Sequence, residues 1–280
     1  MRGEVTAIAD VSVLTIVKNR TAAVLNLING LAQGTAYPAE LVVVFMNEDI
    51  PILPEVPFAV HCFELTSAEA LPLAKARNHA VEKAKGKCLI FLDVDCIPSA
   101  DLVNNFSKAL KSGVILSGRV RYLEKDAELR HFDDDLLNRF SKPDPIRADI
   151  NPLPYELFWS LNFGCGRNTF LQIGGFDEEF HGYGAEDTDF SFRAREFGVA
   201  IENVNATAYH QYHASYTPPL NHFSDIIHNA NVFFQKWGKW PMEGWLHAFQ
   251  QLGYITWTQN SIHVLKIPKQ DKNLRTIDTL

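Results

Sequence analysis

A short apolar run that stops at two aspartates constrains the fold of this chain more than any other feature. Residues 88–92 read Cys-Leu-Ile-Phe-Leu, and Asp93, Val94 and Asp95 follow directly. An apolar run of this length, bounded by polar residues, predicts a buried strand of a parallel sheet. Extended backbone places side chains i and i+2 on the same side, so we expect Asp93 and Asp95 to face together.

Two carboxylates on one face are costly to bury unless a cation or hydrogen-bond donors neutralise them. Open α/β sheets bind their ligands at the carboxyl ends of their strands, which is where this pair lies. The pair therefore predicts a divalent metal held by oxygen atoms. The alternative is a pair of solvated turn residues, and the buried strand before them favours the metal.

Apolar segments that suit strands alternate with helical patterns through the first 120 residues. Strands are predicted at residues 11–17, 41–45, 58–63, 88–92 and 114–120, and helices at 21–33, 73–85 and 100–112. This alternation predicts an α/β fold with a Rossmann-like, mostly parallel central sheet flanked by helices.

The alternation dissolves between residues 122 and 155, which hold four prolines and three consecutive aspartates. We interpret this segment as a mobile loop region with some helix near residues 134–140. Further elements are predicted as a strand at 158–165, helices at 168–173 and 186–197, and one or two strands at 199–209. Residues 221–280 are rich in aromatic side chains and predict a C-terminal helical extension.

Composition limits the class of protein. The chain has 280 residues, 46% of them hydrophobic, which is enough for one large core, and a net charge of −7, which disfavours nucleic acid as a partner. Cys62, Cys88, Cys96 and Cys165 form no C-x-x-C pair, so we expect reduced thiols rather than structural zinc. No apolar run suits a secretory signal or a membrane span. We therefore expect a cytoplasmic protein, with peripheral contact to a membrane left open.

A second acidic group opens a predicted helix at Glu186-Asp187-Thr188-Asp189. Acids are stabilised at a helix N-terminus by the helix dipole, which is the structural alternative to a functional role. The preceding Gly182 and Gly184 favour the functional reading, because they allow a tight turn and the close approach of a ligand. The helix start should keep Asp187 ionised, as a general base requires.

Two histidines follow the last predicted strand in the pattern His210-x-x-His213. Two histidines in a polar turn are often surface residues, and this pair alone does not make a zinc site. The two histidines become candidate metal ligands if they face Asp95 across a cleft. An imidazole with one or two carboxylates suits Mn²⁺ or Mg²⁺ with open positions for a substrate.

Four segments together resemble one family of enzymes. They are Leu-Ala-Lys-Ala-Arg-Asn at 73–78, Phe-Leu-Asp-Val-Asp-Cys-Ile-Pro at 91–98, the glycine-rich stretch 162–177, and His-Gly-Tyr-Gly-Ala-Glu-Asp at 181–187. In this order they resemble the nucleotide-sugar-dependent glycosyltransferases of the GT-A fold. The nearest groups are the GT2 family and the C-terminal region of the β-1,4-galactosyltransferases. The similarity spans roughly residues 10 to 215 and includes the D-x-D motif of these enzymes.

The resemblance implies a role for each matching residue. Asp95 would ligate Mn²⁺ or Mg²⁺ on the donor diphosphate, and Asp93 would lie near the ribose or the metal. His210 would complete the metal site, with His213 as a second candidate. The residues implied near the nucleotide are Asn19, Arg77 and Asp49, with Glu48 as an alternative to Asp49.

The resemblance also implies the chemistry. Asp187 would be the general base, and Glu186 would position hydroxyl groups of acceptor or donor. Related retaining enzymes carry Glu-Asn where this chain has Glu186-Asp187, and an amide cannot accept the proton, so inversion is expected. The partners implied are a nucleotide-sugar donor, expected to be a UDP-sugar, and a carbohydrate or lipid-linked acceptor.

The domain organisation implied is a catalytic domain over residues 1–220 and the extension over 221–280. Within the catalytic domain, 1–115 is the nucleotide-binding half, 122–155 the mobile region and 155–215 the acceptor and catalytic half. Aromatic candidates for contact with sugar are Trp159 and Tyr183, whereas Trp237 is expected to pack. Lys236, Lys239, Trp240 and Trp245 suit either a membrane contact or a packed extension.

Two other functions stay open at this point. A nucleotidyltransferase that makes activated sugars also sets acids on an α/β sheet, but it usually begins with a glycine-rich phosphate loop. Here Lys18-Asn19-Arg20 follows the first strand instead. A non-catalytic sugar-binding protein of the same fold is the second alternative, although every expected acid is present.

Overall fold

A nine-stranded sheet forms the centre of the computed structural model, which describes residues 5–125, 127 and 132–269. The strands are β1 (Ala7–Val17), β2 (Tyr37–Met46), β3 (Ala59–Leu65), β4 (Cys88–Leu92), β5 (Cys96–Pro98), β6 (Val114–Leu123), β7 (Ser141–Pro143), β8 (Asn162–Gly166) and β9 (Ala200–His210). Their order is β3-β2-β1-β4-β8-β6-β9-β5, and β7 pairs with β6. The long ladders β1–β2, β2–β3 and β6–β9 are parallel, which confirms the mostly parallel sheet. The inserted strand β8 runs antiparallel to both of its neighbours.

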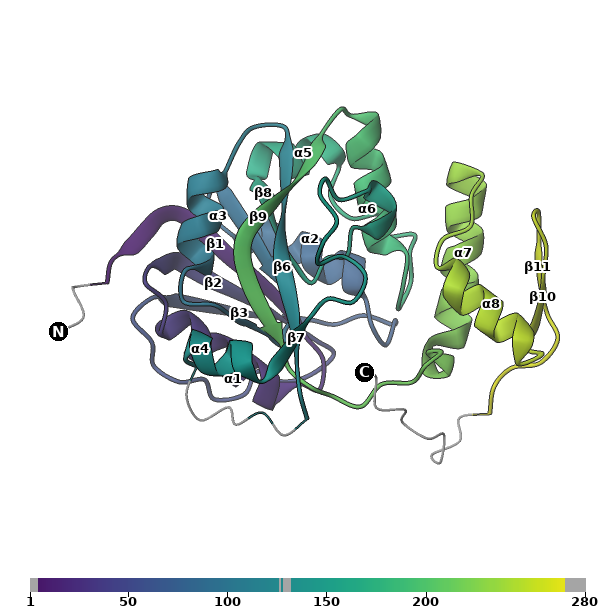
Figure 1. Ribbon diagram of the computed structural model, residues 1–280, viewed down its shortest axis with the longest axis horizontal. Helices are drawn as coiled ribbons and strands as arrows, with labels where there is room; N and C mark the ends of the chain where they lie inside the picture. The colour runs from purple at the N-terminus through teal and green to yellow at the C-terminus, as the bar shows by residue number, and fades with distance from the viewer. Residues whose placement is uncertain (1–4, 126, 128–131, 270–280) are drawn as a thin grey trace.

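Helices cover both faces of the sheet (Figure 1). One face carries α1 (Thr21–Ala32) and α3 (Leu102–Ala109), and the other carries α2 (Leu73–Lys83), α5 (Arg167–Ile173) and α6 (Glu186–Glu196). Successive side chains along β1 point to opposite faces of the sheet and pack against the helices on each face. Val13 packs toward α1 and α3, whereas the adjacent Leu14 packs toward α2 and α6. A buried parallel strand is apolar on both faces for this reason.

The segment 122–155 is more ordered than the sequence suggested. Its predicted helix is confirmed as α4 (Asp134–Arg139), but β7 was not predicted, and a 3₁₀ helix, η1 (Tyr155–Leu157), closes the segment. The buried Asp144 accepts hydrogen bonds from the backbone N–H groups of Ile146 and Arg147, each 2.9 Å long. The interpretation of 122–155 as a mobile loop region with some helix near 134–140 missed the order of 141–147, where a strand pairing and a buried carboxylate hold the chain. Residues 126 and 128–131 of this segment lie outside the described residues.

The C-terminal part contains α7 (Phe223–Trp237), α8 (Glu243–Gln251) and a hairpin of β10 (Ile255–Trp257) and β11 (Ile262–Val264), preceded by the 3₁₀ helix η2 (Leu220–His222). It lies beside the sheet, on the side of α6 (Figure 1), and has its own small core. The prediction of helices is confirmed, whereas the hairpin was not predicted. None of the helices in the described ranges is long and apolar enough to cross a membrane.

Side chains of the extension that suited either membrane contact or packing are partly packed. Trp240 stacks on Phe234 with ring centroids 4.1 Å apart, and its Nε1 donates to the carbonyl of Gln259. Lys236 lies 2.6 Å from a carboxylate oxygen of Asp177. These contacts favour the packed reading for Lys236 and Trp240. Contact of the extension with a membrane stays a prediction.

Candidate active site

A tight turn joins β4 to β5 and carries the two aspartates. The backbone N–H of Cys96 donates to the carbonyl of Asp93 at 2.9 Å, so residues 93–95 are not extended. The expectation that period-two geometry points Asp93 and Asp95 to one side was therefore wrong. The turn instead gives each carboxylate its own set of partners.

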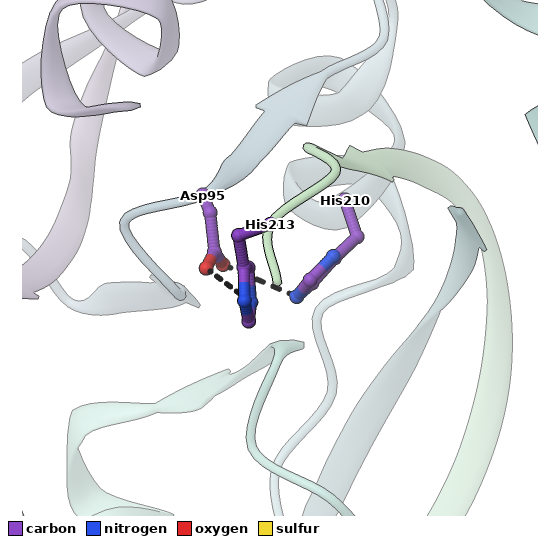
Figure 2. A group of neighbouring side chains, drawn as sticks. All are labelled: Asp95, His210 and His213. Carbon is purple, nitrogen blue, oxygen red and sulfur yellow. Dashed lines mark ion pairs between the residues drawn. The ribbon is translucent and has the colours of Figure 1, made fainter. Parts of the chain in front are cut away.

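Asp95 lies against two imidazoles. His210 Nε2 is 3.5 Å from Asp95 Oδ1, and His213 Nε2 is 3.4 Å from Asp95 Oδ2. The antiparallel pairing of β5 with β9 sets Cys96 opposite His210 and so brings the segments together. Figure 2 shows the three side chains pointing toward one another. One ligand atom from each lies within 4.8 Å of the others.

The charge states of this triad suit a divalent cation. Burial opposes ionisation of Asp95, but His210, His213 and the nearby Arg20 outweigh it and lower its pKa to about 2. Burial lowers the pKa of His210, although Asp95 opposes this shift, and a lower pKa favours the neutral ring with a lone pair available. One carboxylate and two imidazoles fit Mn²⁺ with positions left for a substrate. In the part of the chain that the structure describes, no other cluster of three such side chains meets this spacing.

Asp93 lies outside the triad and pairs with Arg77 instead. Arg77 Nη2 is 3.4 Å from Asp93 Oδ1, and Arg77 Nη1 is 2.9 Å from Glu186 Oε1. The guanidinium lies over the ring of Phe176, 5.2 Å from its centroid, and only 6% of Arg77 is exposed. Arg77 thus ties the turn after β4 to the first residue of α6.

Asp187 follows Glu186 in the first turn of α6. Its Oδ1 accepts from the backbone N–H of Thr188 at 2.7 Å, and its Oδ2 accepts from that of Ser160 at 3.4 Å. Burial and the charge of Glu186 raise the pKa of Asp187, although Arg77 and these N–H groups oppose the rise. The helix start was expected to keep Asp187 ionised, and burial beside a second carboxylate works against this.

The loop before α6 has left-handed backbone at Gly182, Gly184 and Ala185, with φ of 63°, 102° and 71°. The tight turn expected from the two glycines is confirmed. A Cβ at Gly184 would lie 2.7 Å from the sulfur of Met242, and a Cβ at Gly182 would collide with Asp225. The close neighbour that these glycines admit is the C-terminal part of the chain, where we had expected a ligand.

The residues expected near the nucleotide surround the carboxyl ends of β1 and β2. Asn19 has a left-handed φ of 54°, and its backbone N–H donates to Glu48 Oε2 at 2.5 Å. Glu48 and the exposed Asp49 line a hollow of about 340 Å³, whose other walls are Asn47, Glu64, Leu65 and Thr66. Both candidate carboxylates therefore border the same space.

Two residues of the site escaped the sequence analysis. Arg20 Nη1 lies 3.5 Å from Asp95 Oδ2, and 37% of its side chain is exposed. Its position after β1 was a usable signal, because β1 pairs with β4 and their carboxyl ends share an edge. The ring of Tyr122 packs 5.1 Å from that of His210. Nothing in the sequence marked Tyr122, since it begins the segment without a pattern.

The aromatic candidates for sugar contact already pack against other side chains of the protein. Tyr183 stacks on His222 with centroids 4.6 Å apart and on Trp245 at 5.8 Å. Trp159 carries the guanidinium of Arg147 4.2 Å above its ring. A role of Trp159 or Tyr183 in binding sugar stays a prediction.

Comparison with known proteins places this chain in a family. Residues 59–231, more than half of the chain, match the family described as "Glycosyltransferase like family 2". An uncharacterized glycosyltransferase of Bacillus subtilis, YwdF, is 25% identical over 193 residues, which cover 66% of this chain and 67% of that protein. Validoxylamine A glucosyltransferase of Streptomyces hygroscopicus is 38% identical over 70 residues, 25% of this chain and 16% of that protein.

Solved structures agree on the fold. The mannosyltransferase PcManGT of Pyrobaculum calidifontis, in complex with GDP-Man and Mn²⁺, superposes with a TM-score of 0.52 at 17% identity, over 87% of this chain and 69% of that one. TarS of S. aureus in complex with UDP-GlcNAc superposes with a TM-score of 0.55 at 14% identity, over 80% of this chain and 66% of that one. GalNAc-T7 with UDP, GalNAc and Mn²⁺ gives a TM-score of 0.53 at 17% identity, over 80% and 50% of the two chains.

The fold is that of the GT-A glycosyltransferases. The chain belongs to the family 2-like glycosyltransferases.

Proposed function

We propose that this protein transfers a sugar from a nucleoside-diphosphate sugar to an acceptor hydroxyl, with a divalent cation and with inversion at the anomeric carbon. One observation carries the proposal. Asp95, His210 and His213 meet at the turn after β4, and Arg77 links Asp93 of that same turn to Glu186 at the start of α6.

Asp95, His210 and His213 would hold the cation. A bound cation supplies Lewis acidity that stabilises the negative charge developing on the leaving diphosphate. Two imidazole ligands favour Mn²⁺ over Mg²⁺, which prefers oxygen. Arg20, a partly exposed cation beside the triad, suits contact with the same diphosphate. Asp93, held by Arg77, is proposed to lie near the ribose rather than on the metal.

The nucleotide would enter the hollow beside Asn19, Glu48 and Asp49, whose volume of about 340 Å³ is within the range of small-molecule sites. Uridine is the base we propose. Two of the similar structures, TarS and GalNAc-T7, contain a UDP-sugar or UDP, whereas PcManGT contains GDP-Man.

Asp187 is the proposed base. An acceptor hydroxyl is a poor nucleophile until it loses its proton, and a buried carboxylate with a raised pKa is well suited to take that proton near neutral pH. Glu186, oriented by Arg77, would hold hydroxyl groups of acceptor or donor. Direct displacement assisted by Asp187 inverts the anomeric carbon.

For the chain as a whole we propose residues 1–220 as the catalytic domain, with the nucleotide in 1–115 and the acceptor in 155–215. The acceptor would be a carbohydrate or a lipid-linked glycan. Within residues 221–269, α7 adjoins the acceptor half through the packing of Phe233 on Phe180 and Phe192.

A donor screen tests the function. The protein is incubated with UDP- and GDP-sugars, with Mn²⁺ or with a chelator, and the nucleotide product is identified. Release of nucleoside diphosphate that depends on Mn²⁺ supports transfer chemistry. In a parallel reaction with UTP or GTP and a sugar 1-phosphate, release of pyrophosphate would instead indicate a nucleotidyltransferase. A lack of metal-dependent binding of any nucleotide in calorimetry would support a non-catalytic protein.

A further inference from the structure

Helix α7 is hydrogen-bonded to the loop that precedes the acidic start of α6. Asn229, on the buried side of α7, has no exposed surface. Its Oδ1 accepts from the backbone N–H of His181 at 3.0 Å. Its Nδ2 donates to the carbonyls of His181 and Gly184, each at 2.8 Å, and of Tyr183 at 3.3 Å. One carboxamide thus satisfies four backbone groups of a single loop.

The loop depends on such partners because its own conformation is unfavourable. Gly182, Gly184 and Ala185 are all left-handed, and such a conformation costs about 1 kcal/mol or more for a residue with a Cβ such as Ala185. Backbone that neither continues a helix nor joins a sheet leaves polar groups that must find partners when buried. A strained conformation of this kind persists where its surroundings hold it, and Asn229 is the side chain that holds it.

A second contact lies farther along α7. Trp237 Nε1 donates to Asp189 Oδ1 at 2.9 Å, and Lys236 Nζ lies 2.8 Å from the same oxygen. Asp189 is fully buried and comes two residues after Asp187 on α6. The expected packing role of Trp237 is confirmed, and its indole N–H also adds a polar contact. Helix α7 therefore holds α6 on both sides of Glu186 and Asp187, through Asn229 before them and through Trp237 and Lys236 after them.

We propose that Asn229 is a positioning residue for sugar transfer, which fixes the loop 181–185 and through it the placement of Glu186 and Asp187. This inference rests on the proposed function. It gives the C-terminal part of the chain a role in catalysis. The sequence alone would not suggest this role, because Asn229 is far from the D-x-D turn along the chain. A misplacement of about 1 Å in a reacting group can lower the rate about 100-fold.

The test compares two asparagines of the same helix in the full-length protein. Asn229→Ala removes the four contacts to the loop. Asn231→Ala is the matched control, because Asn231 Nδ2 bonds only to the carbonyl of Ile227 one turn earlier in α7, at 2.8 Å. Measurements are kcat and donor KM for transfer or donor hydrolysis, calorimetric affinity for UDP with Mn²⁺, and the melting temperature.

Asn229→Ala should lower kcat by about 10- to 100-fold while the affinity for UDP with Mn²⁺ is unchanged, because the triad is built from Asp95 and residues 210–213 and not from the loop 181–185 that Asn229 holds. Asn231→Ala should behave as the wild type. Equal kcat in the two variants would overturn the proposal. A parallel loss of kcat and nucleotide affinity would also overturn it, since that would indicate general damage to the fold.

If Asn229→Ala does not fold, Trp237→Phe carries the test, because it keeps an aromatic ring and removes the donor to Asp189. The expected result is a fall in kcat of about threefold at unchanged nucleotide affinity. An unchanged kcat there would overturn the proposal. Failure of the proposed function looks different, because the wild type and Asn231→Ala would then be inactive with every nucleotide sugar.

Discussion

Asp187 and Asp95 show how one small region sets two carboxylates to opposite tasks. Asp95 is buried beside imidazoles and Arg20, which lower its pKa to about 2 and keep it charged for a cation. Asp187 is buried beside Glu186, and its pKa is raised. Neighbouring charges of opposite sign therefore shift the pKa values of the proposed metal ligand and the proposed base in opposite directions, as is common for acid–base pairs in active sites.

The role of Asp187 is tested by Asp187→Asn. The amide keeps the size of the side chain but cannot take a proton, so we expect transfer to fall by about 100- to 10,000-fold. Binding of UDP with Mn²⁺ should survive, measured by calorimetry. Glu196→Gln, which removes one charge from the exposed end of the same helix, is the control. Full activity in Asp187→Asn would exclude Asp187 as the base.

The pH dependence of the rate gives a second test at this scale. A base acts in its deprotonated form, so kcat/KM should fall as the pH drops through the pKa of Asp187, which burial and Glu186 raise to about 7. Glu186→Gln removes one cause of the rise and should move this acidic limb to lower pH. A limb that lies near pH 4 in the wild type would contradict the assignment.

At the scale of elements, an aromatic cluster joins β4, β8, α5 and α6 beneath the site. Phe91 stacks on Phe163 with centroids 4.3 Å apart, and Phe176, in the turn after α5, stacks on Phe190 at 4.6 Å. Phe170 of α5 lies 5.6 Å from both Phe91 and Phe190 and joins the two pairs. The guanidinium of Arg77 also lies over the ring of Phe176. The position of the buried guanidinium thus depends on the packing of four elements.

Phe163→Ala should therefore destabilise the fold. Phe163 is fully buried, and loss of a buried phenylalanine side chain costs about 3–5 kcal/mol. The measurement is the free energy of unfolding from denaturant titration. Phe197→Ala, at an exposed position after α6, should change it by about 0.5 kcal/mol or less. Equal effects of the two substitutions would contradict this account of the core.

Local patterns predicted most elements because burial imposes them. The run at 88–92 matches β4 residue for residue, since a strand buried on both faces must be apolar throughout. The three-residue strands β7, β10 and β11 carry too few positions for a period to show. The turn at 93–95 was considered only as the alternative, because two aspartates at i, i+2 look the same in a strand and in a turn.

Convergence of the site could be predicted only in part. The resemblance named Asp95, His210 and His213, but their meeting depends on the pairing of β5 with β9, two segments about 110 residues apart in sequence. Pairings of that range follow from the whole topology and leave no local signal. The same limit explains why Asn229 was not recognised: its partners lie in a loop 45 to 48 residues earlier.

At the scale of the whole molecule, a cation would link distant parts of the chain in the folded state. A ligand that binds only the folded protein stabilises it, by about 2.7 kcal/mol at 100 times its Kd. Mn²⁺ should therefore raise the melting temperature of the wild type, and Asp95→Asn should abolish the rise. Asp149→Asn, an exposed aspartate, is the control and should retain it. An equal rise in all three proteins would argue against the triad as the metal site.

The pairing of β5 with β9 also has a consequence during synthesis of the protein. During synthesis Asp95 leaves the ribosome more than 100 residues before His210 and His213, and Asn229 follows later still. A nascent chain that ends shortly after the D-x-D turn thus lacks both the imidazoles and the contacts made by α7. The proposed metal site can therefore assemble only after His213 has been synthesised, and the contacts of Asn229 with the loop 181–185 can form only later.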